Sequence, residues 1–156
     1  MRTSYFICCF VIYVAIPNIA LSQVLSGFFN LVNKNSNLCL AVSNASTLPG
    51  AETYQWNADG TTDKAWQLIY LEGSTYKVKN AKSQLFLGLK SPAQFNGEKI
   101  VQRVEYNGDA QELNWIFINA GNGYYKIQNR FSRLYLAVEG SSFERGRPLI
   151  QWADLG

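Results

Sequence analysis

Short alternations, in which every second residue is a large aliphatic one, run through most of this chain and predict strands. In residues 38–42 these side chains take alternate positions, which places them on one face of an extended segment. The same spacing returns at residues 85–89 and 134–138. No stretch keeps the 3.6-residue periodicity of an amphipathic helix, so the pattern predicts an all-β chain.

These alternations belong to an internal repeat. Six residues of one copy recur 47 positions later and again 49 positions after that, without a gap. They are Asn33, Ser36, Leu38, Leu40, Gly50 and Gln55, then Asn80, Ser83, Leu85, Leu87, Gly97 and Gln102, then Asn129, Ser132, Leu134, Leu136, Gly146 and Gln151. Such a period is typical of domains built from copies of one supersecondary unit. We therefore expect three repeats, at residues 27–71, 72–120 and 121–156.

Each copy is expected to contain four short strands. In the first copy they fall at residues 29–32, 38–42, 54–56 and 66–69. The polar residues 33–37 join the first two strands, and the recurring Asn and Ser are expected to hydrogen-bond the backbone of that turn. The third copy reaches Gly156 before its fourth strand, so eleven of twelve expected strands are present. Either the sequence is a fragment, which we favour, or the sheet keeps an open edge that something else covers.

The first 22 residues lie outside the repeat and have the pattern of a secretory signal peptide. Arg2 precedes an apolar run at residues 5–16, which a proline ends. Small side chains follow where signal peptidase reads them, which predicts cleavage between Ser22 and Gln23. A membrane anchor is the alternative, but this run is shorter than the ~20 residues that a spanning helix needs. We expect a secreted protein with no membrane span, in which residues 23–156 form one domain.

Composition excludes several classes of function. The net charge is +3, and loss of the first 22 residues leaves 13 basic against 11 acidic residues, scattered along the chain. Because a nucleic-acid-binding surface gathers basic residues on one face, no nucleic-acid partner is expected. The chain has no histidine, which removes the commonest general base and metal ligand. Its acids form no motif that pairs two carboxylates for glycoside hydrolysis. We therefore expect no enzyme, no metal site and no cofactor.

Cys39 is the one cysteine that signal cleavage would leave. Its equivalents in the other copies are Phe86 and Tyr135, so the position accepts any apolar group that fits. We interpret Cys39 as a packed hydrophobic residue rather than a reactive thiol. The domain is then expected to have no internal disulfide and to depend on its core.

The spacing of glycine, glutamine and tryptophan resembles that of the ricin-type (ricin B chain-like) lectin family. In the first copy Gly50 precedes Gln55 and Trp56, and Trp66 opens the fourth strand. The resemblance covers residues 28–156. It implies a β-trefoil, in which three hairpins form a short barrel and three others cap it, with at most one shallow sugar pocket per repeat. The fold expected is an all-β trefoil of three repeats of about 45 residues that lacks the last strand of the third.

In that family an aromatic ring stacks on the sugar, while a carboxylate and an amide grip its hydroxyls. The resemblance places the aromatic position of the three repeats at Trp56, Arg103 and Trp152. It places the second-strand acid at Ala41, Gly88 and Ala137, so the acid is absent from all three. The amide pair becomes Asp63-Lys64 in the first repeat and Glu112-Leu113 in the second, and the third repeat has none.

The first repeat is therefore expected to hold the best pocket. Its candidate ligand-binding residues are Trp56, Asp63 and Lys64, with Asn57 and Asp59 nearby. Trp152 marks a second candidate pocket in the third repeat. The second repeat is expected to have lost its pocket, because Arg103 cannot stack as a tryptophan does. Alternatively, Arg103 marks a changed ligand, such as an acidic sugar or a sulfate.

Other interpretations of these residues stay open. Trp56 and Trp152 are either ligand-binding or part of the core, whereas Trp66 and Trp115 are expected in the core. The charged pair Asp63-Lys64 is either part of a pocket or an ordinary solvated turn.

The leading hypothesis is a secreted carbohydrate-binding module whose partner is a sugar or glycoconjugate. The alternative is a secreted trefoil that binds a protein through its loops, as an inhibitor or toxin-associated subunit, with Phe95 and Phe143 as candidate contacts. If the chain is a fragment, a further domain beyond Gly156 is possible, with this part as its targeting module. Asn44 begins an Asn-Ala-Ser glycosylation sequon in a predicted loop.

Overall fold

The computed structural model describes residues 10–12, 25–106 and 110–154. Thirteen strands in this part of the chain join into a single sheet. The strands are β1 (Phe10–Ile12), β2 (Gly27–Phe29), β3 (Leu31–Asn33), β4 (Cys39–Val42), β5 (Thr53–Trp56), β6 (Trp66–Glu72), β7 (Thr75–Asn80), β8 (Phe86–Leu89), β9 (Ile100–Arg103), β10 (Asn114–Gly121), β11 (Tyr124–Asn129), β12 (Tyr135–Val138) and β13 (Leu149–Trp152). The 3₁₀ turns are η1 (Ser43–Ala45), η2 (Thr62–Lys64), η3 (Gln111–Leu113) and η4 (Glu139–Ser141).

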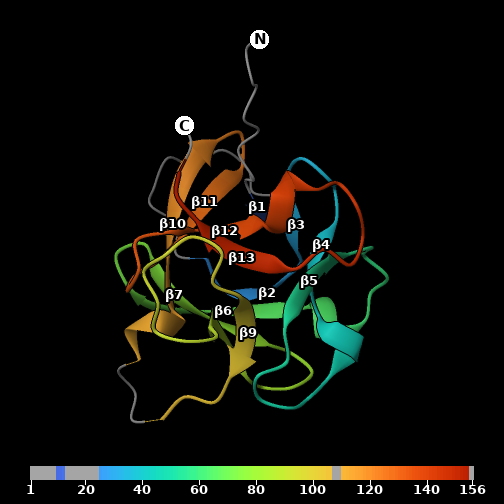
Figure 1. Cartoon of the computed structure of the whole chain (residues 1–156), viewed down its shortest axis with the longest axis horizontal. Helices are drawn as coiled ribbons and strands as arrows, with labels where there is room; N and C mark the ends of the chain where they lie inside the picture. The colour runs from blue at the N-terminus through green and yellow to red at the C-terminus, as the bar shows by residue number, and fades with distance from the viewer. Residues whose placement is uncertain (1–9, 13–24, 107–109, 155–156) are drawn as a thin grey trace.

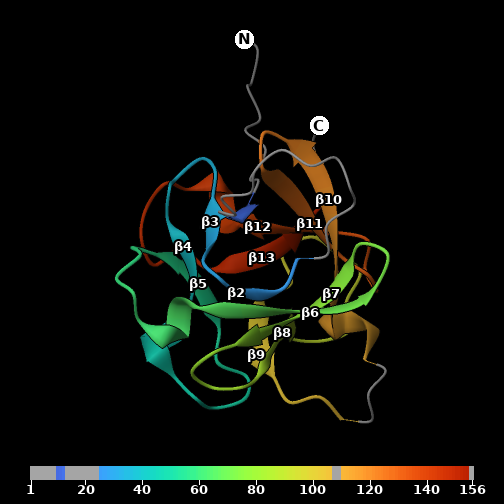
Figure 2. The same cartoon turned by 180° about the vertical axis from the view of Figure 1, so that it is seen from behind.

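The three copies fold alike and surround one axis. Each contributes a hairpin from its second and third strands, namely β4–β5, β8–β9 and β12–β13. The first and fourth strands form a barrel, in which β6 pairs with β7, β7 with β10, and β10 with β11. The three hairpins contact one another through β5, β9 and β13 and pack against that barrel (Figures 1 and 2). The predicted all-β trefoil of three repeats is therefore confirmed.

The first strand of the first copy is split between β2 and β3. Its early part, β2, pairs with β6 of the same copy, and its later part, β3, pairs with β1. In the second copy β7 serves both neighbours as one continuous strand. Strand β1 is the only described part of the predicted signal peptide. Its removal and the secretion of the protein stay predictions.

The core is built from the apolar residues that alternate along these strands. Trp66 and Trp115 are fully buried at the starts of β6 and β10, which confirms them as core residues. The indole N–H of Trp66 donates to the carbonyl oxygen of Leu40 at 3.0 Å, and that of Trp115 to Leu87 at 2.9 Å. Each tryptophan therefore ties its barrel strand to the hairpin of its own repeat and leaves no buried indole N–H unpaired.

Cys39 is buried in β4, opposite Trp56 in the hairpin register, as expected of a packed residue. Its Sγ lies 3.2 Å from the backbone oxygen of Trp56. Burial raises the pKa of the thiol to about 11, which makes it a poor nucleophile at neutral pH. Within the described ranges, no helix has the length and apolar character needed to cross a membrane.

The recurring Asn and Ser hold the turns, as the sequence predicted. Oδ1 of Asn80 accepts hydrogen bonds from the backbone N–H groups of Lys82 and Ser83, at 3.0 and 3.1 Å. Asn129 accepts in the same way from Phe131 and Ser132.

The side chain of the recurring glutamine joins its own repeat to another one, a role that the sequence did not indicate. The amide nitrogen of Gln102 donates to the carbonyl oxygens of Ser46 and Leu48, at 2.9 and 2.8 Å. Gln55 does the same to Ser142 and Glu144 of the third copy, and Gln151 to Ala93 and Phe95 of the second. All three glutamine side chains are fully buried. Each copy thus holds the hairpin loop of another copy in place.

We predict that Gln102→Leu lowers the free energy of unfolding by about 1–3 kcal/mol, because two loop carbonyls and the Ser83 hydroxyl lose their partner. Urea unfolding measures the effect. Gln94→Leu is the matched control, because Gln94 is exposed, and it should change stability by less than about 0.5 kcal/mol. Equal effects of the two substitutions would contradict this role of Gln102.

Candidate functional site

A cleft of about 460 Å³ lies on the hairpin of the first repeat. It is lined by Ala41, Val42, Ser43, Asn44, Ala45, Tyr54, Trp56, Asp59, Thr61, Asp63, Lys64 and Gly146. Eleven of these come from the first copy, and Gly146 comes from the third. The cleft is therefore made where two repeats meet.

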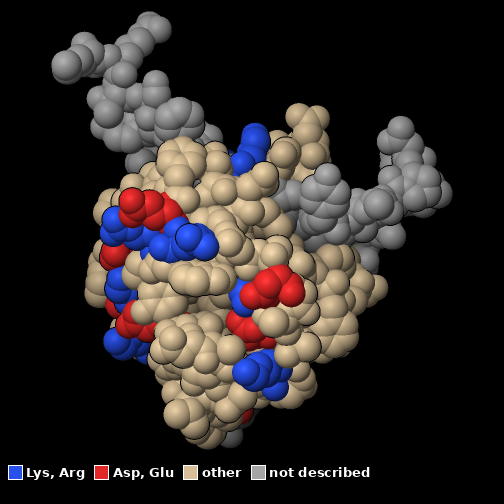
Figure 3. Space-filling model, turned by 90° about the vertical axis from the view of Figure 1, so that its right-hand side faces the viewer, with Lys and Arg blue, Asp and Glu red and all other residues tan. Residues whose placement is uncertain are grey.

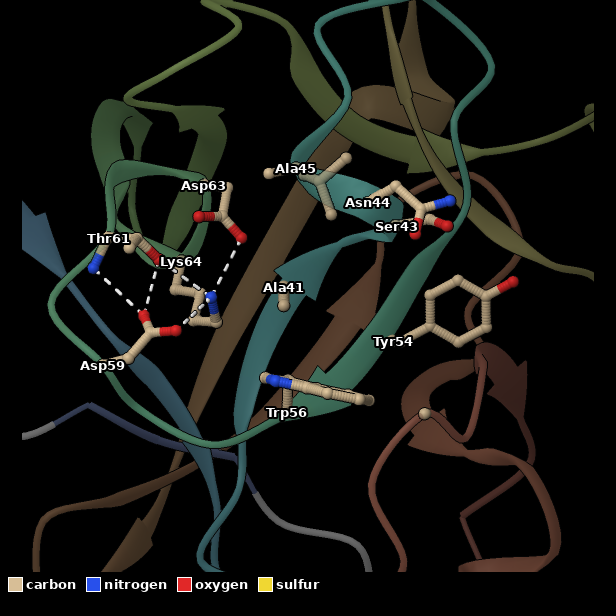
Figure 4. Close-up of a pocket in the computed structure, with 12 residues that line it drawn as sticks. Ala41, Ser43, Asn44, Ala45, Tyr54, Trp56, Asp59, Thr61, Asp63 and Lys64 are labelled. Atoms are coloured by element: carbon tan, nitrogen blue, oxygen red, sulfur yellow. Dashed lines mark hydrogen bonds and ion pairs between the residues drawn. The ribbon is translucent and has the colours of Figure 1, made fainter.

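Trp56 forms one wall of the cleft because of the alternation along β5. Thr53 and Gln55 point inward and are buried, so Tyr54 and Trp56 face outward. The side chain of Trp56 is 43% exposed, which removes the interpretation of this tryptophan as a core residue. In Figure 4 its ring lies below Ala41, and the side chains of Asp59 and Asp63 lie to the left of that alanine. Because Ala41 is small, the space between ring and acids stays open.

Four polar residues, Asp59, Thr61, Asp63 and Lys64, form the polar wall of the cleft, and Lys64 contacts the other three. Its Nζ donates to Oδ2 of Asp59 at 3.0 Å, to Oγ1 of Thr61 at 2.8 Å and to Oδ2 of Asp63 at 3.1 Å (Figure 4). Asp63 is 5% exposed and Lys64 is 7% exposed. The two residues therefore do not form a solvated turn, because η2 turns both side chains inward against β4.

These contacts set the charge states of the polar wall. Hydrogen bonds from the hydroxyl of Thr61, then from Lys64 and the backbone N–H of Thr61, lower the pKa of Asp59 to about 2. Burial alone would lower the pKa of Lys64, but its hydrogen bonds to Asp59 and Asp63 outweigh burial and raise it. The wall therefore keeps its ammonium and the Asp59 carboxylate ionised at neutral pH.

The third copy supplies the opposite rim. Gly146 has φ of 77°, and a side-chain carbon there would lie 3.5 Å from the ring of Trp56. The guanidinium carbon of Arg145 lies 5.7 Å from the centre of the same ring, within the range of a cation–π contact. The backbone N–H of Gly146 donates to the backbone carbonyl oxygen of Gln55 at 2.9 Å, which fixes this loop beside Trp56.

The other predicted ligand-binding residues lie elsewhere. Asn57 is exposed and does not line the cleft. Trp152 ends β13 in the third repeat, 39% exposed, and its ring lies 3.9 Å from where a side-chain carbon on Gly97 would stand. The third repeat thus repeats the arrangement of the first, with an outward tryptophan beside the loop of another copy. Trp152 therefore lies apart from the cleft of the first repeat.

The second repeat is filled by its own side chains. A side-chain carbon on Gly88 would lie 2.3 Å from Cδ2 of Leu113, the residue at the position of Lys64. Arg103 lies in the same space, where it donates to the carbonyl oxygen of Leu89 at 3.1 Å and pairs with Glu112 at 3.2 Å. Both partners of Arg103 belong to its own repeat, so its guanidinium is held against the second hairpin.

Some lining residues were not identified from the sequence. Tyr54 shares the outward face of β5 with Trp56, so the period of two contained enough information to find it. Thr61 and Gly146 carried no such signal, because one depends on a turn and the other on packing between copies. Among the described residues, no three His, Cys, Asp or Glu side chains gather as a metal site would require.

The face that carries β4 and β5 mixes acidic and basic side chains (Figure 3). Positive and negative groups lie close together there, with neither sign dominating. This face has no field of one sign that would attract a polyanion.

A comparison with models of known protein families finds a match for this chain. The profile of the ricin-type beta-trefoil lectin domain-like family matches residues 18–103 and again residues 65–152. The chain belongs to this family. The two overlapping matches are offset from each other by about one repeat, as expected of a sequence with three similar copies. No curated protein sequence matches the chain significantly.

Solved structures agree with this ricin-type trefoil. The designed threefold-symmetric protein ThreeFoil is 30% identical, with a TM-score of 0.79, over 83% of this chain and 91% of its own. The exo-β-1,3-galactanase 1,3Gal43A from Clostridium thermocellum is 32% identical, with a TM-score of 0.78, over 89% of this chain but 29% of the enzyme. The Polyporus squamosus lectin, bound to the epitope Neu5Acα2-6Galβ1-4GlcNAc, is 18% identical, with a TM-score of 0.71. The similarity covers 86% of this chain and 46% of the lectin chain.

We predict that the carboxyl of Asp59 titrates near pH 2 in carbon-13 NMR spectra. Because this folded-state pKa is below the ordinary 3.8, the ionised carboxyl stabilises the fold above about pH 4, and its contribution is lost as the pH falls toward 2. Thr61→Val removes the strongest hydrogen bond to the carboxyl and should raise the pKa toward 3.8. Thr47→Val, in a different loop, should leave the pKa unchanged. A midpoint that stays near 2 in Thr61→Val would refute the assignment.

We also predict that Gly88→Ala lowers the free energy of unfolding by about 1–3 kcal/mol, although alanine stands at the equivalent positions 41 and 137. The cause is the clash with Leu113. In a Leu113→Ala background the same change should cost clearly less, and the double-mutant cycle measures this coupling. Strict additivity would show that Leu113 is not what fills the second repeat.

Proposed function

We propose that this chain is a non-catalytic carbohydrate-binding module whose principal site is the cleft of the first repeat. The observation that carries the proposal is the outward ring of Trp56 facing a polar wall across an open floor at Ala41. A sugar ring has an apolar face and a rim of hydroxyls, so it needs one aromatic surface and several polar groups around it. The cleft offers both.

The polar wall supplies both donors and acceptors. Lys64 binds Oδ2 of Asp63, which leaves Oδ1 of that carboxylate with no partner among the described residues. Asp63 lines the cleft, so Oδ1 is the acceptor we assign to a sugar hydroxyl. Lys64 has already placed its three N–H donors on protein oxygens. Its role in this proposal is to hold the wall in position rather than to grip the sugar alone.

This arrangement replaces the grip of the ricin-type pocket rather than reproducing it. Ala41 stands where the resemblance places an acid, and the carboxylate comes instead from Asp63 on the other wall. The sugar hydroxyls that are bound therefore differ in position from those the family's acid would select. We expect modest affinity at one site, with Trp152 providing a second, weaker one.

Related structures support the proposal at the level of class. The Polyporus squamosus lectin carries a sialylated trisaccharide on a similar fold, and the galactanase joins a similar domain to an enzyme that acts on a galactan. Neither likeness names the sugar for this chain, because the lining residues of its cleft are its own.

A protein-binding role is the second candidate, and one observation favours it. The three equivalent hairpin loops each expose a large apolar side chain, namely Leu48, Phe95 and Phe143, which are 70%, 61% and 59% exposed. These loops are the ones that the buried glutamines hold in place. Rigid, exposed apolar tips favour contact with another protein.

A glycan array followed by calorimetry on the best ligand tests the sugar-binding function. We predict that Trp56→Ala weakens binding by at least about tenfold, or about 1.4 kcal/mol, and that Trp152→Ala reduces the number of sites. Tyr106→Ala, which truncates an exposed aromatic residue that does not line the cleft, is the matched control and should bind normally.

Two other results would redirect the proposal. Binding that survives in Trp56→Ala would move the site out of the first repeat. Failure of the folded protein to bind any glycan would overturn the sugar-binding function. In that case Leu48→Ser and Phe95→Ser become the variants that test the protein-binding alternative.

A further inference from the structure

The barrel has a sixth position, between β3 and β11. In the first two repeats the corresponding place is filled by the fourth strand, β6 or β10, which the alternation of the sequence predicts. The described residues of the third repeat end at β13 and the residues just after it. The strand that lies at the sixth position is β1, from the opposite end of the sequence.

Strand β1 takes up the register of a fourth strand toward β3. Phe10 lies opposite Asn33, as Trp66 lies opposite Asn80 and Trp115 opposite Asn129. These three asparagines are the recurring residue that opens each turn. The next two positions of β1 continue in step, with Val11 opposite Val32 and Ile12 opposite Leu31.

The other edge of β1 follows the same rule. Phe10 lies opposite Tyr125 on β11, as Trp115 lies opposite Tyr76 and Trp66 opposite Phe29. The residue order aromatic, any, aliphatic is also shared, since β1 reads Phe-Val-Ile where β6 begins Trp-Gln-Leu. Strand β1 thus has the same register as β6 and β10 on both of its edges, and a similar residue order. We therefore interpret it as occupying the equivalent position in the barrel rather than as an apolar segment in chance contact.

We propose that the space between β3 and β11 is a strand-acceptor site and that β1 is its occupant, so that Phe10–Ile12 takes the register that the fourth strand takes in the first two repeats. The physical cause is the cost of leaving two barrel edges open. Unpaired N–H and C=O groups of β3 and β11 would lie beside the core residues Leu31 and Ile127, which are buried. An extended apolar segment satisfies both edges at once.

Strand β1 reproduces the pairing of a fourth strand, but the recurring asparagine opposite its first residue makes a different hydrogen bond. The side-chain nitrogen of Asn80 donates to the carbonyl oxygen of Asp63 at 2.9 Å, and that of Asn129 to Glu112 at 3.0 Å. Asn33 instead donates to Oε1 of Gln55 at 3.1 Å. Among the described residues, Asn33 therefore has no counterpart of the bond that Asn80 and Asn129 make to the turn before β6 and β10. Such a local exception at a threefold position is expected where the strand comes from a different part of the chain.

This proposal gives the predicted signal peptide a second role. Strand β1 lies inside the apolar run at residues 5–16, and cleavage after Ser22 would remove it. In a chain that keeps its first 22 residues, β1 closes the barrel. In a chain that has lost them, the site between β3 and β11 is available to another extended segment of the same residue order.

Disulfide trapping in the full chain tests the occupant. In a Cys8→Ser, Cys9→Ser, Cys39→Ser background, which also removes the thiol opposite Val32 on β4, Val11→Cys is combined with Val32→Cys or with Tyr124→Cys, the residues opposite Val11 on its two sides. Opposed residues of antiparallel strands lie about 4.5–5.5 Å apart at Cα, a distance that a disulfide spans. We predict that both pairs form intramolecular disulfides under mild oxidation, detected by gel mobility and mass spectrometry.

Two controls set the scale. Gln67→Cys with Lys79→Cys occupies the equivalent register between β6 and β7 and should cross-link at a similar rate. Val11→Cys with Lys79→Cys places the second thiol at the same register position in another repeat and should cross-link at least about tenfold more slowly.

The contrary results are equally specific. Cross-links that join only two chains would show that the strand comes from a second copy, which overturns β1 as the intramolecular occupant. No difference between the Val32 and Lys79 partners would overturn the placement of β1. Reaction with Val32 but not with Tyr124 would show that β1 leaves β11 open and does not close the barrel.

Discussion

The hydrogen bonds of three buried glutamines hold the repeats of this protein in one relative position. Gln55 uses its whole capacity, since its nitrogen donates to two carbonyls of the third copy and its oxygen accepts from Asn33 and Ser36. An amide with four partners in a buried setting stabilises one geometry strongly, because every competing arrangement leaves some group unpaired. Trp56 follows Gln55 in the chain. The residue that fixes the contact between copies therefore also fixes the platform of the cleft.

Much of the fold followed from the sequence because the repeat states each element three times. The alternations gave the strands, and the invariant Asn and Ser marked turns whose hydrogen bonds the structure contains. Trp66 and Trp115 were assigned to the core from the strands they open. These features depend on residues close in sequence, so periodicity and turn chemistry were enough to find them.

The site was less predictable because it depends on contacts between distant residues. The burial of Lys64 results from η2 packing on β4, and nothing in the order Thr-Asp-Lys distinguishes this from an exposed turn. Gly146 reaches the cleft only through the loop that Gln55 binds. The use of residues 10–12 as a strand was hidden for a different reason, since an apolar leader and a buried strand have the same composition. The local pattern of apolar residues therefore cannot distinguish a signal peptide from a strand of the barrel.

The closed order of the three contacts has a consequence for how such a protein arises. Copy one receives the loop of copy three, copy three that of copy two, and copy two that of copy one. A cleft thus combines the hairpin of one copy with the loop of another, and a single copy of this unit lacks the rim that Gly146 supplies to the first cleft. Repetition of the unit is then needed to complete the cleft, and does not merely multiply a cleft that one copy already has. Once the ring exists, each junction is free to diverge alone, as the open first junction and the filled second one have done.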